Sequence, residues 1–198
     1  MADLTAFVLA GGKSSRMGAD KASLLLDGRT LLERALELAR SVAEDVRIVG
    51  AREKFAAFAP VIEDEYAERG PLGGIHAALS ASSSPRSLIL AVDLPFLEER
   101  FLQYLVAEAR AGIATVTVPR AGGGLQPLCA VYGHEFGELA EQALAAGRNK
   151  IDTLFAQIPV RIIEEEELTR FAFSAAMFDN LNTRDEWEQA RRRRQQKT

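Results

Sequence analysis

The stretch 7–21 carries residue types that suit the binding of a phosphate chain. Gly11 and Gly12 lack a Cβ and reach positive φ readily, so their backbone N–H groups can approach an anion and point at it. Arg16 offers a planar fork of donors to phosphate oxygens, and Lys21 adds a compact charge at the far end. We therefore predict a phosphate-binding loop with Arg16 and Lys21 as catalytic groups. The alternative is a glycine turn that only joins two elements.

The spacing within this stretch matches neither of the two commonest phosphate loops. No Gly-Lys-Ser/Thr follows a four-residue gap, and no glycine triplet has dinucleotide-binding spacing. Residues 9–21, Leu-Ala-Gly-Gly-Lys-Ser-Ser-Arg-Met-Gly-Ala-Asp-Lys, instead resemble the signature loop of nucleotidyltransferases that move a nucleoside monophosphate onto a phosphorylated acceptor. The Leu-Ala-Gly-Gly opening is most similar to that of the molybdenum cofactor guanylyltransferases. This resemblance implies that GTP is bound by Leu9, Ala10, Gly11, Gly12 and Lys21.

Asp93 is the strongest candidate metal ligand. It follows the most apolar run of the chain, 88–92, where an uncompensated carboxylate is costly and Mg²⁺ carrying triphosphate oxygens would offset its charge. The alternative is an aspartate that caps the following helix or turn. The segment from Asp93 to Pro95 also resembles the metal-binding Asp-x-Pro element of the guanylyltransferases, which implies Mg²⁺ on Asp93.

Two further segments resemble the family. Asp64 precedes the glycine-rich segment 70–74, and the resemblance implies that the aspartate helps to bind the nucleotide while the glycines, Gly73 among them, lie beside the base. Asn180-Leu-Asn182, before a threonine, resembles an Asn-x-Asn-Thr element that completes the metal's surroundings or binds the acceptor's phosphate. Without the resemblance, Asp64 is better read as a loop aspartate, and Asx turns or capping account for the asparagines equally well.

The sequence departs from the family at one contact. The family often has an asparagine after the second strand, whereas residues 49–52 read Val-Gly-Ala-Arg, so we assign no site residue there. Gln126-Pro127 and the pair Arg148 and Lys150 match places where the family approaches its acceptor. Arg148 and Lys150 would hold a second phosphate, or they are ordinary surface cations near a helix end.

The elements that must position these residues alternate between strand and helix. Apolar runs predict strands at 6–10, 46–49, 61–62, 88–92, 115–118, 128–132 and 160–163. Helical spacing predicts a helix that begins at the capping box of Thr30 and Glu33, further helices at 75–81, 101–109, 136–144 and 151–155, and a last helix from Thr183. Residues 70–74 are expected to form a turn, and 164–167 a solvated charge run.

This alternation predicts a layered α/β fold with a mostly parallel sheet. The family resemblance specifies a three-layer α/β/α nucleotidyltransferase fold with a Rossmann-like N-terminal half, in one domain over 1–198. Ligands of such sheets bind outside the carboxyl ends of the strands. The phosphate loop and Asp93 are therefore expected to face one cleft.

Composition narrows the class of protein. With 198 residues, of which 47% are hydrophobic, the chain suits one substantial core. One cysteine, Cys129, excludes an internal disulfide, and we expect it to be buried. A net charge of −4 argues against a general nucleic-acid binder, and no apolar run approaches membrane-spanning length. We expect a cytoplasmic protein.

Together these features predict a Mg²⁺-dependent guanylyltransferase. Its substrates would be GTP and molybdopterin or the molybdenum cofactor, and a molybdopterin-delivering protein is a possible partner. Two alternatives stay open: a related cytidylyl- or sugar-phosphate nucleotidyltransferase, and a non-catalytic module that senses GTP. Pyrophosphate release with each nucleotide distinguishes the three.

Overall fold

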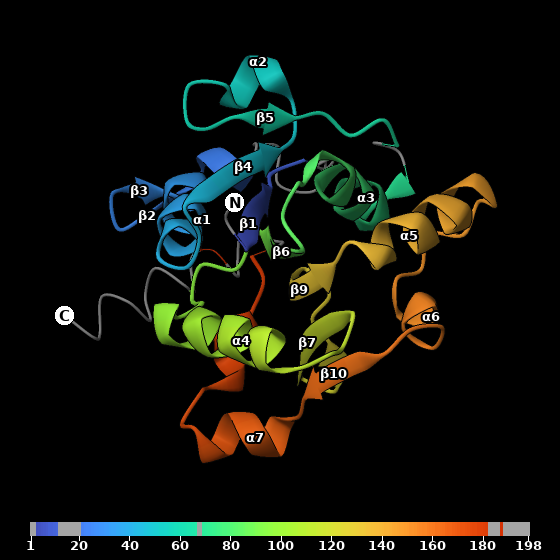
Figure 1. Cartoon of the computed structure of the whole chain (residues 1–198). Coiled ribbons are helices and arrows are strands. Elements are labelled where there is room, and N and C mark those ends of the chain that lie inside the picture. Colours follow the sequence, from blue (N-terminus) through green and yellow to red (C-terminus); the bar gives the residue numbers. More distant parts are fainter. Residues whose placement is uncertain (1–2, 12–20, 67–68, 182–186, 188–198) are drawn as a thin grey trace.

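The computed structural model describes residues 3–11, 21–66, 69–181 and Trp187. Its centre is an eight-stranded sheet, in which seven strands lie in the order β10-β7-β9-β6-β1-β4-β5 and β8 pairs with β7 (Figure 1). The strands of this sheet are β1 (Leu4–Leu9), β4 (Asp45–Val49), β5 (Val61–Ile62), β6 (Arg86–Ala91), β7 (Val116–Ala121), β8 (Gly124–Leu125), β9 (Cys129–Gly133) and β10 (Val160–Ile163).

The sheet is mostly parallel, as predicted. β1 pairs in parallel with β4 and with β6, β4 with β5, and β7 with β10. Strand β9 is antiparallel to both β6 and β7, so among the seven strands in that order it alone runs in the opposite direction. The carboxyl ends of β1, β4, β6 and β7 therefore lie at one edge of the sheet.

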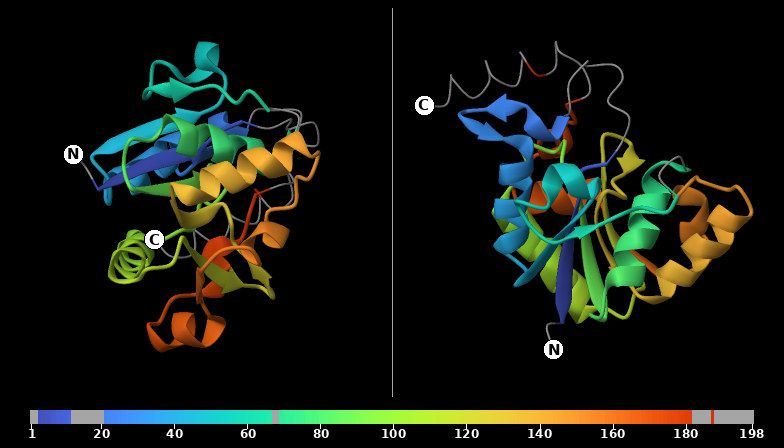
Figure 2. Two further views of the ribbon diagram at one scale, coloured as in Figure 1. Left: turned by 45° about the vertical axis from the view of Figure 1, so that its right-hand side comes forward. Right: turned by 90° about the horizontal axis from the view of Figure 1, so that it is seen from above.

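Helices cover both faces of the sheet and make three layers. On one face lie α1 (Leu31–Arg40), α4 (Glu99–Ala111), α7 (Glu165–Arg170) and the short helix η3 (Ala175–Phe178). On the other lie α3 (Pro71–Ala81), α5 (Glu135–Ala145) and α6 (Asp152–Phe155). Helices α3 and α5 pack side by side, as the view from above shows (Figure 2). Each face of the sheet has its own apolar core, which is typical of a parallel sheet buried on both sides.

The start of α1 confirms the predicted capping box. Thr30 Oγ1 accepts a hydrogen bond of 3.1 Å from Glu33 N, and Glu33 Oε2 accepts one of 2.8 Å from Thr30 N. Before it, the hairpin of β2 (Leu25–Leu26) and β3 (Arg29–Thr30) turns at Asp27 and Gly28, with φ of 53° and 77°. Positive φ at both central residues is what the tightest hairpin turn requires. The hairpin and the short helix η1 (Lys21–Ser23) lead the chain from the phosphate loop into α1.

The prediction of a turn at 70–74 is wrong, because α3 begins at Pro71. Gly70 is the N-cap, with φ of 72°, and proline suits the first helical position because its missing N–H would have no partner there. The glycines allow close packing instead of a turn. A Cβ on Gly73 would lie 2.8 Å from Asp64 Oδ2, whereas one on Gly74 would meet Leu9 at an ordinary 3.5 Å.

The charge run predicted at 164–167 is solvated only in part. Glu165 and Glu166 are exposed, but most of the four carboxylates are paired around α7. Glu164 binds Arg120 Nε at 2.8 Å, and Glu165 Oε1 accepts a 3.0 Å hydrogen bond from Gly123 N. Glu167 binds Arg161 Nη2 at 2.5 Å. The run therefore connects α7 to the ends of β7 and β10. The expected last helix from Thr183 and the tail at 191–194 lie outside the described residues, apart from Trp187.

Candidate active site

Lys21 and Asp93 meet although 72 positions separate them. Lys21 Nζ lies 3.0 Å from Asp93 Oδ2, and each side chain is 20% exposed. Lys21 opens η1 after the phosphate loop, and Asp93 follows β6, whose neighbour β1 leads into that loop. The two candidates are thus brought together at the carboxyl edge of the sheet. The prediction that both face one site is supported at these two positions.

The geometry argues against Asp93 as the cap of the next helix. Helix α4 begins at Glu99 with Glu98 as its N-cap, and the carboxylate of Asp93 contacts Lys21 instead. Mg²⁺ was predicted to offset the charge of Asp93. In the structure without ligands, the ammonium of Lys21 lies next to this carboxylate and offsets its charge. The pair is partly exposed, which limits its contribution to stability to about 1 kcal/mol or less.

The donor set around Asp93 fits a hard cation that is shared with a phosphate chain. Within the described residues, no group of three or more His, Cys, Asp or Glu side chains is close enough together to hold a metal ion. Mg²⁺ in proteins is commonly bound by one or two carboxylates, with phosphate oxygens and water completing six positions. A single carboxylate next to Lys21, the lysine predicted to bind phosphate, is therefore sufficient on the protein side.

The C-terminal segment reaches the same place. Leu181 N donates a 3.2 Å hydrogen bond to the backbone oxygen of Asp93, and the Leu181 side chain is buried in the core beneath β6 with Met177 and Phe178. The exposed Asn180 therefore directly precedes a residue that contacts Asp93, and its role in the site stays a prediction. Asn182 lies outside the described residues, as do Gly12 and Arg16 of the phosphate loop.

The chain leaves β1 pressed against the end of β4. Val92 N donates to Leu9 O at 3.2 Å, and Ala10 N donates to Val49 O at 2.9 Å. A Cβ on Gly11 would lie 3.8 Å from Gly50 Cα, so the two glycines are neighbours. The three residues predicted to contact the nucleotide therefore lie beside the carboxyl ends of β4 and β6. They are Leu9, Ala10 and Gly11.

The tight packing at Gly50 explains why no side chain replaces the family's asparagine there. A Cβ on Gly50 would come within 3.0 Å of the ring of Phe55, the buried last residue of α2 (Arg52–Phe55). Arg52, the nearest long polar side chain, binds Val61 O at 2.9 Å and Glu63 at 3.7 Å. After β4 the chain therefore offers Gly50, which has no side chain, Ala51, which is apolar, and Arg52, which is already bound elsewhere. Sequence reasoning missed this use of Gly50.

Asp64 has the loop contact that its sequence position favours. Its Oδ1 accepts a 2.7 Å hydrogen bond from Tyr66 N, an Asx turn, and its carboxylate touches the first turn of α3 at Gly73. Burial raises the pKa of Asp64, although the Tyr66 hydrogen bond opposes this. The ring of His76 packs edge-on against Tyr66, with the two ring centroids 5.4 Å apart. A nucleotide role for Asp64 and Gly73 stays a prediction.

The candidate acceptor residues lie around the end of β7 and after α5. Gln126 Nε2 donates to Ala121 O at 3.0 Å, which fixes the amide within the β7–β8 hairpin at the same sheet edge as Asp93. Arg148 and Lys150 are exposed beyond the end of α5. Cys129 is fully buried in β9, and burial raises its pKa, so its thiol is an unreactive core group.

Comparison with known proteins decides the family. The sequence model described as the MobA-like NTP transferase domain matches residues 6–165. This chain belongs to that family. It is 35% identical over 190 residues to a molybdenum cofactor guanylyltransferase of Desulfosudis oleivorans, covering 94% of each chain. It is 33% identical to a probable molybdenum cofactor guanylyltransferase of Pelotomaculum thermopropionicum, over 96% of this chain and 93% of the relative.

Solved structures agree on the fold. The molybdopterin-guanine dinucleotide biosynthesis protein A of Archaeoglobus fulgidus superposes with a TM-score of 0.83 at 27% identity, covering 97% of this chain and 99% of that one. A CMP:2-keto-3-deoxy-manno-octonic acid synthetase superposes with a TM-score of 0.77 at 13% identity, over 99% and 100% of the two chains, which shows a shared fold only. As a MobA-like NTP transferase, this protein is a nucleotidyltransferase.

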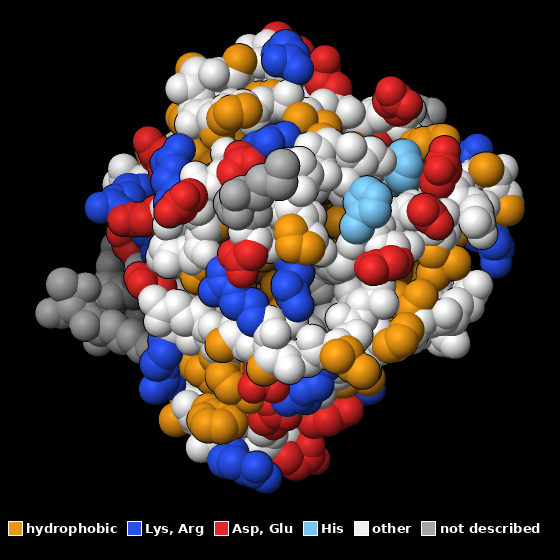
Figure 3. Space-filling model, viewed as in Figure 1, with side chains coloured by type: hydrophobic (Ala, Val, Ile, Leu, Met, Phe, Trp, Pro, Cys, Tyr) orange, Lys and Arg blue, Asp and Glu red, His pale blue; other side chains and the backbone are white. Residues whose placement is uncertain are grey.

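The surface carries charged side chains of both signs, as the small net charge of −4 suggests. On the face drawn in Figure 3, acidic and basic side chains are interspersed with apolar ones. None of the helices in the described ranges is both long enough and apolar enough to cross a membrane.

Proposed function

We propose that this protein transfers GMP from GTP to the terminal phosphate of molybdopterin or the molybdenum cofactor, uses Mg²⁺, and releases pyrophosphate. The observation that carries the proposal is the meeting of Lys21 and Asp93 at the carboxyl edge of the sheet. These are the phosphate-binding and metal-binding positions in a chain whose relatives are named molybdenum cofactor guanylyltransferases.

The chemistry requires positioning more than proton transfer. A phosphate monoester has a second pKa of about 6, so the attacking phosphate of the acceptor is largely dianionic near neutral pH and needs no general base. Lys21 and Arg16 hold the phosphate chain of GTP so that pyrophosphate departs in line with the attack, and the N–H groups of Gly11 and Gly12 bind its oxygens. Asp93 would hold Mg²⁺, which would supply positive charge to offset the charge that develops on the phosphate oxygens.

The Lys21–Asp93 contact implies a rearrangement when GTP binds. The ammonium that neutralises Asp93 in the free protein is also the group proposed to hold a phosphate. Lys21 therefore swings from Asp93 to a phosphate oxygen, and the freed carboxylate oxygen becomes available to a divalent cation. Nucleotide and metal ion are then expected to bind cooperatively, because each favours the state in which the ion pair is broken.

Main chain at the ends of β1 and β4 and at the start of α3 would suit guanine. Gly11 and Gly50 bring main chain together at the ends of β1 and β4, and Gly73 with Asp64 lies at the start of α3. Backbone N–H groups can donate to O6 of guanine, and carbonyl or carboxylate oxygens can accept from N1–H and the exocyclic amine. Adenine reverses part of this pattern, and each buried group left unpaired costs about 1–3 kcal/mol.

The acceptor is proposed to enter from the β7–β8 side. Gln126 and the hairpin lie at the same sheet edge as Asp93, and Asn180 directly precedes Leu181, whose N–H binds the backbone oxygen of Asp93. Asn180 and Asn182 would then bind the acceptor's phosphate or complete the metal's surroundings. We further propose a single domain over 1–198, a cytoplasmic location and delivery of molybdopterin by a partner protein.

The test is pyrophosphate release, measured with GTP, CTP or ATP, with and without molybdopterin, in Mg²⁺ or in EDTA. We expect release only with GTP, molybdopterin and Mg²⁺ together. Asp93→Asn should abolish release while preserving the fold, and the matched control Asp152→Asn, at an exposed residue of α6, should leave it unchanged. Release with CTP alone among the nucleotides would indicate a cytidylyltransferase, and GTP binding without turnover would indicate a sensor.

A further inference from the structure

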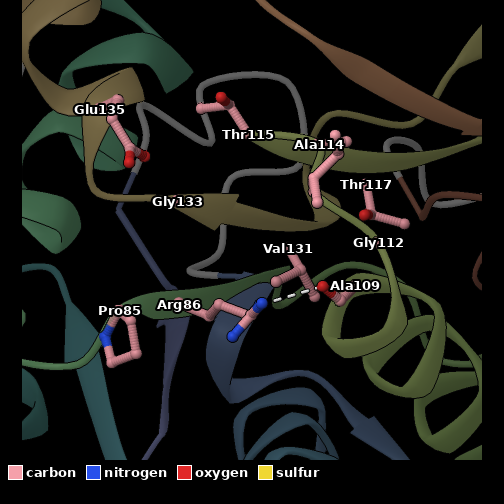
Figure 4. Close-up of a pocket in the computed structure, with 11 residues that line it drawn as sticks. Pro85, Arg86, Ala109, Gly112, Ala114, Thr115, Thr117, Val131, Gly133 and Glu135 are labelled. Atoms are coloured by element: carbon pink, nitrogen blue, oxygen red, sulfur yellow. Dashed lines mark hydrogen bonds between the residues drawn. The ribbon is translucent and has the colours of Figure 1, made fainter.

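A second pocket lies at the opposite end of the sheet from the Lys21–Asp93 site. It has a volume of about 210 Å³ and is enclosed by the start of β6, the end of α4 with the residues that follow it, the start of β7 and the end of β9 (Figure 4). In the same measure one water needs roughly 15 Å³, so the space admits a small organic molecule. Neither the sequence motifs nor the proposed reaction uses it.

The pocket is remote from the proposed chemistry. Arg86, which lines it, begins β6, and Asp93 follows the other end of that strand. Seven positions of largely extended chain separate the two residues, which corresponds to roughly 20 Å. A ligand here could not touch a nucleotide bound at Lys21 and Asp93, so the pocket is a separate site.

Arg86 supplies positive charge to this pocket. Its side chain is half-buried, and Nε donates a 3.0 Å hydrogen bond to Ala109 O near the end of α4, which fixes the guanidinium. Figure 4 shows the guanidinium directed into the space beside Val131. Asp3 is close enough for the charge of Arg86 to contribute to its lowered pKa, but both its carboxylate oxygens are bound by Arg110, each at 2.8 Å. Within the described residues, the hydrogen bond of the Arg86 side chain is the one from Nε to Ala109 O, and the terminal nitrogens make none.

Glu135 places negative charge across from Arg86. Gly133 is the register partner of Arg86 in the β6–β9 pair, and a Cβ on Gly133 would lie 2.7 Å from Glu135 Oε2, so the carboxylate lies over this glycine. Among the described residues, no ion pair within 4.0 Å joins Arg86 to Glu135. Opposite charges therefore line one small pocket without contacting each other.

Two threonines complete the lining. Thr117 is buried opposite Val131 in the β7–β9 pair, and Thr115 lies immediately before β7. Figure 4 shows the side chains of Thr115 and Thr117 among the residues that line the pocket. Their hydroxyls can donate or accept hydrogen bonds. The exposed Ile113 at the rim is the one large apolar side chain that the lining offers besides Val131.

We propose that this pocket binds a small zwitterion with the chemistry of an α-amino acid. The fork of Arg86 receives the carboxylate, and the carboxylate of Glu135 receives the ammonium group. Thr115 and Thr117 bind the remaining polar atoms. A side chain at Gly133 would displace the Glu135 carboxylate, because its Cβ would lie 2.7 Å from Glu135 Oε2. The inference is independent of the proposed guanylyl transfer, since it uses none of the residues of that site.

The test is isothermal titration of the full-length protein with a panel of probes: glycine, alanine, serine and aspartate as zwitterions, and acetate, methylammonium and inorganic phosphate as single charges. We expect at least one zwitterion to bind roughly tenfold or more tightly than acetate and methylammonium, because only it engages both charges. No binding by any amino acid of the panel would overturn the proposal. Equal binding of acetate or phosphate would also overturn it, and would indicate a simple anion site.

Substitutions at Arg86 and Glu135 test whether these two side chains bind the zwitterion. Arg86→Gln and Glu135→Gln should each weaken the zwitterion roughly tenfold or more, and the matched control Glu138→Gln, an exposed residue of α5 outside the lining, should not. Arg86→Lys provides a second variant if loss of the Ala109 contact destabilises the fold. Unchanged affinity in Glu135→Gln would contradict the proposed role of the second charge. GTP affinity should be the same in all four variants.

Discussion

Lys21 Nζ lies 3.0 Å from Asp93 Oδ2, so the two residues proposed to bind the phosphate chain and the metal ion bind each other in the free protein. Both side chains are 20% exposed, which leaves the pair accessible to a competing ligand. A nucleotide and a divalent cation together can replace both halves of the contact, whereas either alone must leave one charge without its partner. This relationship leads to the first prediction.

Lys21→Ala should increase the affinity of the protein for a divalent cation in the absence of nucleotide, because Asp93 loses the ammonium that competes with the metal. We expect an increase of up to roughly fivefold, since a partly exposed pair contributes about 1 kcal/mol or less. Mn²⁺ binding measured by electron paramagnetic resonance tests this, with Lys54→Ala on α2 as the control. Unchanged or weaker Mn²⁺ binding in Lys21→Ala would show that the two do not compete. The same variant should lose most GTP turnover.

Gly73→Ala should destabilise the protein by about 1–3 kcal/mol, because its Cβ would lie 2.8 Å from both Asp64 Oδ2 and Tyr66 O. Gly74→Ala is the matched control one position on. Its Cβ meets Leu9 at 3.5 Å, and alanine favours a helix interior. Chemical denaturation of both variants checks the difference. Equal stability of the two would mean that Asp64 does not pack against α3 as described.

Gly50→Ala should destabilise the protein because its Cβ would come within 3.0 Å of the Phe55 ring. Adding Phe55→Leu should recover part of that loss, because it removes the ring atoms in the way, at the separate cost of a smaller core residue. The coupling in a double-mutant cycle of unfolding free energies is the quantity to measure. Additive effects would contradict the proposed contact and the explanation for the missing asparagine.

The pH prediction concerns Glu167. Burial acts to raise the pKa of this carboxyl, but the hydrogen bonds from Arg161 and Tyr104 outweigh it and hold the pKa below its usual 4.5. A carboxyl with a lowered pKa in the folded state contributes stability above pH 4.5 that is lost as the pH falls through the folded value. Glu167→Gln should therefore destabilise the protein at pH 7 and have much less effect near pH 3. Its control is the exposed Glu166→Gln, and an equal loss at both pH values would exclude this linkage.

Much of the fold could be predicted from apolar periodicity and capping. The strand before the phosphate loop, the central β6 and the capping box at Thr30 depend on local sequence, and each is where the pattern indicates. The turn prediction at 70–74 failed because Gly73 packs inside α3 against Asp64, a contact between side chain and helix that glycine spacing does not reveal. The pairing within the charge run at 164–167 was missed because its partners Arg120, Gly123 and Arg161 come from other strands and loops.

The sequence predicted which residues of the candidate site lie near one another, but it did not predict the hydrogen bonds and ion pairs between them. Strand order places the residues after β1 and β6 at one edge, so the proximity of Lys21 and Asp93 follows from topology. The direct ion pair between them was not predicted, because Lys21 was expected to bind a phosphate and Asp93 a metal ion. The Leu181 hydrogen bond to Asp93 depends on where the C-terminal segment crosses beneath β6, which no local pattern encodes.

Transfer of the label from [α-³²P]GTP to molybdopterin tests the central claim most directly. With Mg²⁺ present, the account predicts that the α-phosphate appears in a molybdopterin–guanine dinucleotide and that γ-labelled GTP gives labelled pyrophosphate in equal amount. Asp93→Asn should give neither product. Label that remains in GTP, or that appears in GDP with release of inorganic phosphate, would contradict guanylyl transfer.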